Sequence, residues 1–85
     1  MERTIVSQEY LLSWMNAKKD KYDKCTNCHF TSIVLLKEPD VRGCNWAGTN
    51  LRCSEVPVEI CQPVAQEVID QAKEKFNVTI EGGRH

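Results

Sequence analysis

Five cysteines lie between residues 25 and 61 of this 85-residue chain, and the first two form the tight motif Cys25-Thr26-Asn27-Cys28. A chain of this length forms one domain, 1–85, and on folding it buries only a little over about 60% of the surface that its unfolded state exposes. Domains this small often need disulfides or a bound metal to stabilise a marginal core. The cysteines therefore restrict the fold more than any other feature of the sequence.

The sequence predicts that these thiols stay reduced. The N-terminus, Met1 to Ser7, shows no basic segment followed by an apolar run, so it does not look like a secretion signal. We therefore expect a cytoplasmic protein, in which a cysteine pattern indicates metal binding or catalysis more often than disulfides. The odd number of cysteines favours the same interpretation, because two disulfides would leave one thiol unpaired. No run reaches transmembrane length, so we expect no membrane partner.

The cysteine spacing predicts a structural zinc site. Zn²⁺ takes four tetrahedral ligands, and a C-x2-C turn presents two sulfurs to one ion. Cys61 lies just before Pro63, where the N-terminus of a predicted helix would stabilise a thiolate. In an extended Leu51-Arg52-Cys53 segment, Cys53 shares a face with Leu51. The predicted Zn²⁺ ligands are Cys25, Cys28, Cys53 and Cys61, with Cys44 and His29 as alternates.

The order of elements around these cysteines resembles that of zinc-ribbon and treble-clef domains. A cysteine knuckle, a strand and a final helix that begins near a cysteine occur in both, and the resemblance covers about residues 25–61. The chain departs from those families because it lacks their second close pair. The resemblance implies a ligand role for Cys25, Cys28 and Cys61. An iron–sulfur cluster also accepts four cysteines, and spacing does not separate it from zinc.

Two other chemistries use the same motif. A thioredoxin-type dithiol is C-x-x-C, so the alternative function is a cytosolic thiol-disulfide oxidoreductase that uses Cys25 and Cys28. Such a dithiol opens a helix after a strand, whereas this pair follows a lysine-rich segment. Residues 25–29 also spell the haem attachment motif C-x-x-C-H, but three further cysteines would then be unexplained, and we expect no haem. No other catalytic constellation is present, so we expect no enzyme.

Hydrophobic periodicity predicts a small α+β fold, a zinc-stapled domain with an N-terminal helix, a cysteine knuckle with short strands and a C-terminal amphipathic helix. Ser7 is a good N-cap for a helix over 7–19, and Val6 and Leu11 occupy the positions of a hydrophobic staple. The apolar run 31–36 predicts a buried strand. Beyond it, residues 41–55 are turn-rich and only 51–53 look extended.

Pro63 predicts the start of the last helix, 63–76, because proline suits the first helical turn. Residues 57–62 then form a separate helical turn, since Pro63 would kink a helix already under way. Val78 and Ile80 suggest an edge strand before a loose tail, 81–85.

The charge pattern bears on the kind of partner. Eleven basic and twelve acidic residues give a net charge of −1, so no global basic field attracts nucleic acid or a membrane. Trp46 stands in a turn-rich stretch near Arg52, and both residue types are enriched at binding hot spots, although a tryptophan there can also cover the core. We predict a small zinc-binding interaction or regulatory module with a protein partner, such as an adaptor or inhibitor encoded by a bacterium or mobile element. A zinc-ribbon-like nucleic-acid-binding protein is a further alternative.

Overall fold

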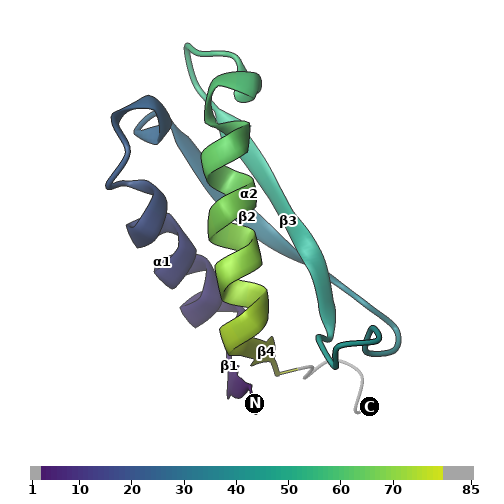
Figure 1. Cartoon of the computed structure of the whole chain (residues 1–85). Coiled ribbons are helices and arrows are strands. Elements are labelled where there is room, and N and C mark those ends of the chain that lie inside the picture. Colours follow the sequence, from purple (N-terminus) through teal and green to yellow (C-terminus); the bar gives the residue numbers. More distant parts are fainter. Residues whose placement is uncertain (1–2, 80–85) are drawn as a thin grey trace.

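Two helices and two small sheets make up the part of the chain that the computed structural model describes, residues 3–79 (Figure 1). The α+β class predicted from the sequence is confirmed. In chain order the elements are β1 (Thr4–Val6), α1 (Gln8–Lys19), the 3-10 turn η1 (Asp23–Cys25), β2 (Cys28–Leu35), β3 (Trp46–Cys53), α2 (Val58–Lys75) and β4 (Phe76–Val78).

Helix α1 begins as its local sequence predicts. The Ser7 hydroxyl accepts a hydrogen bond from the Tyr10 backbone N–H at 3.0 Å, which satisfies one of the free donors of the first turn. Val6 packs against the core that contains the buried Leu11, so both residues of the expected staple are on the inner side. These local contacts set where the helix starts and which face it buries.

The hairpin of β2 and β3 is longer than the sequence predicts. The two strands pair antiparallel from Cys28 opposite Cys53 to Leu35 opposite Trp46, with irregularities between Phe30 and Ser32 and between Val34 and Leu35. Most of β3 comes from the turn-rich stretch. Strand preference depends on what a neighbouring strand and a covering layer offer to each residue, so pairing with β2 brings this poor strand sequence into the sheet.

Helix α2 is continuous through Pro63, so the predicted break before that residue is wrong. A proline nitrogen has no hydrogen, so the carbonyl of Glu59, four residues earlier, loses its intrahelical donor. The turn before Pro63 nevertheless holds Cys61, which is fully buried and covalently bound to Cys25. We infer that this cross-link holds the first turn in place despite the proline.

Both helices cover the same face of the hairpin (Figure 1). Helix α1 contacts β2 and α2 contacts β3, and the core between these layers includes Leu11, Met15, Phe30, Trp46 and Val68. At one end of the molecule β1 pairs in parallel with β4, with Thr4 opposite Phe76 and Val6 opposite Val78. Val78 therefore lies in a strand as expected, whereas Ile80 and the predicted tail 81–85 lie outside the described residues.

Candidate functional site

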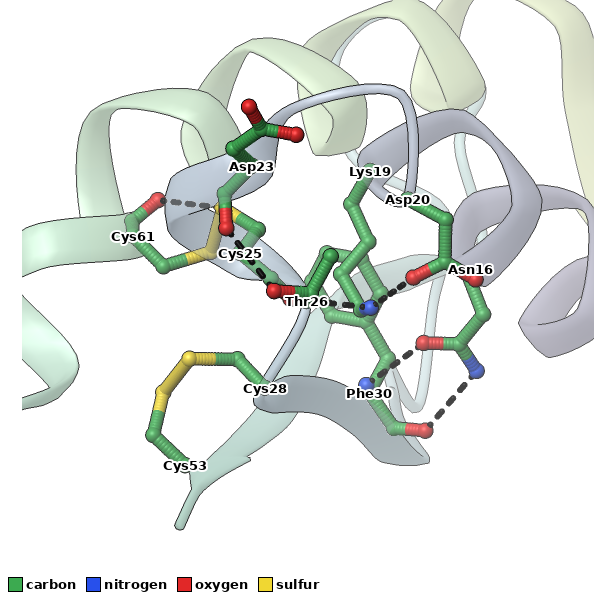
Figure 2. Close-up of a disulfide and its surroundings, with 10 residues drawn as sticks. All are labelled: Asn16, Lys19, Asp20, Asp23, Cys25, Thr26, Cys28, Phe30, Cys53 and Cys61. Carbon is green, nitrogen blue, oxygen red and sulfur yellow. Dashed lines mark hydrogen bonds and ion pairs between the residues drawn. A yellow bond between two sulfur atoms is a disulfide. The ribbon is translucent and has the colours of Figure 1, made fainter. Parts of the chain in front are cut away.

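The four cysteines predicted to bind zinc form two disulfides. Cys25 joins Cys61, with Cα atoms 5.1 Å apart, and Cys28 joins Cys53, with Cα atoms 3.9 Å apart (Figure 2). Within residues 3–79, no group of three or more histidine, cysteine, aspartate or glutamate side chains could hold a metal ion. The prediction of Zn²⁺ is wrong, because a metal ligand must be a thiolate and a disulfide sulfur is not one.

The two disulfides lie at the same end of the hairpin. One links η1 to the first turn of α2, and the other links directly opposed residues of β2 and β3. Beside them the buried Lys19 ammonium forms an ion pair with Asp20 and donates a hydrogen bond to the Cys25 carbonyl at 3.1 Å (Figure 2). This end of the molecule is thus held by covalent bonds and by a buried charge with its partners satisfied.

The cysteine pairing differs from that of the thioredoxin-type dithiol that the C-x-x-C motif also suggested. Cys25 and Cys28 bond to different partners, whereas a thioredoxin-type dithiol forms its disulfide within the motif. Cys44 has a free thiol, which is buried and donates to the Trp46 carbonyl at 3.2 Å. His29, the other alternate ligand, lies exposed on β2 opposite Arg52.

Trp46, predicted as a partner contact, is in the core. Its side chain is fully buried, and its indole N–H donates to the Phe76 carbonyl at 3.0 Å. An indole in this position offers no surface to a partner, so the structure corrects the assignment. Arg52, the second predicted contact, is exposed near the disulfide end of β3.

Each outer edge of the hairpin is contacted at one position by a polar side chain from a helix. The side-chain amide of Asn16 on α1 accepts from the Phe30 N–H at 2.8 Å and donates to the Phe30 carbonyl at 3.2 Å (Figure 2). This amide satisfies the outward backbone groups of Phe30 as a neighbouring strand would. Along β3, a corresponding contact is found at Ala47, whose carbonyl accepts from the Lys73 ammonium at 3.1 Å.

A groove of about 370 Å³ lies between β3 and α2. Leu51 from β3 and Ala65 and Ile69 from α2 give it apolar walls, and Gln62 and Gln66 are polar residues beside them. Thr49 also lines this groove, and its buried hydroxyl has no hydrogen-bond partner in the described part of the chain. The sequence indicated only that Leu51 to Cys53 were extended. It did not reveal this groove, because the groove forms only when α2, the next element in the chain, packs against β3.

A charged cleft of about 330 Å³ lies near the other end of the hairpin. There the Arg3 guanidinium donates to the carbonyls of Lys73 and Arg42, each at 2.6 Å. Backbone N–H donation from Cys44, and secondarily from Arg42, holds the pKa of Asp40 below its ordinary value. Because Arg3 and Asp40 already bind backbone groups around the cleft, we interpret it as a structural tie between Arg3, the 36–45 loop and α2.

Comparisons with protein families, with curated proteins and with solved structures found no match. Among the described residues, no helix is long and apolar enough to cross a membrane.

Proposed function

We propose that this protein is a disulfide-stabilised binding module that regulates or recruits a partner protein, as an adaptor or inhibitor does, and that it is not an enzyme. One observation carries the proposal: both helices cover the same face of the hairpin, and no element within residues 3–79 covers the opposite face, which lies beside a doubly cross-linked end (Figure 1). A surface fixed before binding loses little conformational freedom when a partner docks, which favours affinity.

The side chains on that open face suit protein recognition. His29, Arg52 and Asn50 are exposed, and the Asn50 amide donates to the Ser32 hydroxyl at 2.7 Å, which orders part of the face. Arginine forms planar, bidentate hydrogen bonds and is enriched at binding hot spots. The net charge of −1 makes a nucleic-acid partner a poorer fit.

The disulfides also bear on where the protein works. Disulfides persist in oxidising environments and are rare where thioredoxin and glutathione keep thiols reduced. We therefore propose an oxidising compartment in place of the cytoplasm that the sequence suggested.

The test is affinity capture followed by a binding measurement with the purified partner. Oxidised protein is immobilised in three forms: wild type, Arg52→Glu on the hairpin, and Glu67→Lys on the exposed side of α2 as the matched charge-reversal control. We expect one partner to be retained by wild type and control. In calorimetry, Arg52→Glu should weaken its binding by about tenfold or more, as loss of a charged hot-spot contact does. A protein that retains no specific partner, or equal affinities for both variants, would contradict the proposal.

A further inference from the structure

We propose that the outer edge of β3 binds an extended segment of the partner as a third strand of the hairpin sheet. The inference rests on the proposed function and names its site and the chemistry of its partner. The segment would place apolar side chains in the groove beside α2 and a carboxylate against Arg52. Strand addition of this kind takes its affinity from main-chain hydrogen bonds and its specificity from alternate side chains.

The hydrogen bonds of the hairpin show which backbone groups the β3 edge offers. In an antiparallel pair, directly opposed residues either bond each other or both point outward. Phe30 is opposite Leu51, and both backbone groups of Phe30 turn outward to the Asn16 amide. The N–H and carbonyl of Leu51 must therefore point away from β2, and so must those of Thr49, two residues along the same strand.

These outward groups have no neighbouring strand, since β2 is the strand that pairs with β3 in the described sheet. No described helix or strand lies against this edge in Figure 1. Near the charged cleft, the Lys73 ammonium binds the Ala47 carbonyl at the end of β3. Within residues 3–79, no side chain makes a corresponding hydrogen bond to the backbone of Thr49 or Leu51. An uncovered edge of this kind is a template for pairing with another chain.

The groove suits the inward side chains of an added strand. Thr49 and Leu51 are opposite the buried Ile33 and Phe30, so their side chains lie on the helix-covered face, next to Ala65 of α2. An added strand would bring every second side chain to this same face. The volume of about 370 Å³ accommodates apolar side chains.

The opposite face indicates an acidic residue in the partner segment. Arg52 and His29 are opposed across the hairpin, so their side chains project from the same face. Neither has an ion-pair partner among residues 3–79. A shallow cleft beside them, about 350 Å³, is lined by Thr31, Asn50, Leu51 and Arg52. A carboxylate there could accept two parallel hydrogen bonds from the guanidinium.

A second copy of this chain is a poorer occupant than a different protein. Residues 46–53 carry one charged side chain, Arg52, and no acidic one. Two β3 edges paired with each other would bring no carboxylate from β3 to either Arg52. The charge pattern therefore favours a partner segment that supplies the acid.

The probe is an acetylated peptide as long as β3, eight residues, that alternates valine with threonine and carries one glutamate at a threonine position. Amide hydrogen exchange is followed by NMR on the oxidised full chain. We expect the Thr49 and Leu51 amides to exchange rapidly in the free protein and to slow by about tenfold or more when peptide is bound. The amide of Asn50, which points towards β2, should change little.

A charge swap tests the side-chain part of the proposal. Arg52→Glu should weaken binding of the glutamate peptide by about tenfold or more. The same peptide with lysine in place of glutamate should bind Arg52→Glu more tightly than it binds the wild type. The control variant, Lys75→Glu, lies exposed at the other end of α2 and should bind as wild type does. Arg52 and Lys75 are both exposed, so neither variant should perturb folding. The exchange pattern of the core amides checks this.

Three results would overturn the inference. The peptide could fail to bind, it could bind without protecting Thr49 and Leu51, or the free protein could sediment as a dimer with those amides already protected, which would make a second copy the occupant. The same exchange experiment on a captured natural partner separates the two proposals. A partner that binds without protecting the β3 edge leaves the proposed function standing and removes this inference. Failure to capture any partner removes the function itself.

Discussion

At the scale of single residues, a large core side chain can combine apolar burial with a polar contact. Trp46 is an example, because its large ring is fully enclosed and its N–H reaches the Phe76 carbonyl. The Lys73 ammonium stands 5.8 Å from the centre of the Trp46 ring while it binds the Ala47 carbonyl. One indole therefore connects β3, β4 and the end of α2.

The first prediction concerns this indole. Trp46→Phe should lower the free energy of unfolding by about 1–3 kcal/mol, because the Phe76 carbonyl loses its donor inside the core. Trp46→Ala should cost about 3–5 kcal/mol, as large-to-small aromatic changes do. Urea unfolding followed by circular dichroism measures both. Trp14, half-buried on α1, supplies the control. Trp14→Phe should lower the free energy of unfolding by less than Trp46→Phe does, and the reverse order would contradict the prediction.

At the scale of elements, α1 satisfies the outward backbone groups of one residue on the β2 edge of the hairpin. Asn16 supplies both a donor and an acceptor to Phe30, so the helix and β2 are joined by a pair of hydrogen bonds as well as by packing. Helix α2 lends no such closure to the Thr49 and Leu51 backbone of β3. Among residues 3–79, a helix side chain thus satisfies the outward backbone groups of Phe30 on β2, whereas none is found on those of Thr49 and Leu51 on β3.

The second prediction tests that closure. Asn16→Leu should lower the free energy of unfolding by about 1–3 kcal/mol, because the Phe30 N–H and carbonyl would be left without partners. It should also increase self-association, since a second strand edge becomes open. Denaturation and analytical ultracentrifugation measure the two effects. Ser13→Leu adds the same side chain to an exposed position of α1 and should do neither. Equal behaviour of the two variants would show that the Asn16 amide does not close the edge.

At the scale of the whole molecule, the two ends of the fold are held by different means. The disulfides close loops between residues separated by 36 and 25 positions, and they fix the start of α2 to η1 and the two strands to each other. The other end is held by the parallel pairing of β1 with β4 and by Arg3, which bridges two backbone carbonyls. A domain of this size has a small core, so the covalent end is expected to dominate its stability.

The third prediction separates disulfide stabilisation from metal stabilisation. Removing either disulfide as a pair, Cys25→Ser with Cys61→Ser or Cys28→Ser with Cys53→Ser, should cost about 3–4 kcal/mol by loop-closure entropy. Cys44→Ser should cost less, because that thiol is unpaired. Thermal unfolding should respond to a reductant and ignore a strong chelator. The prediction is contradicted if thermal unfolding responds to the chelator and not to the reductant. Mass spectrometry of the unreduced protein would then show five free thiols.

The sequence by itself determined what depends on neighbours along the chain. Ser7, placed before an apolar-periodic segment, predicted where α1 begins, and the apolar stripe that includes Val64 and Val68 predicted a helix near the C-terminus. Composition and periodicity together predicted the α+β class. These features are local because capping bonds and helical faces join residues only a few positions apart.

Only the tertiary structure decided the features that depend on distant segments meeting. The sequence shows where the five cysteines are but not how they are connected. A disulfide requires two Cβ atoms to approach, and Cys25 and Cys61 are 36 positions apart in the chain. Likewise β3 contains Gly48 and Asn50, which favour turns, and it becomes a strand because β2 pairs with one of its edges and α2 packs on one of its faces. Its open edge and groove arise from that packing, because edge and groove are relations between elements and belong to no single segment.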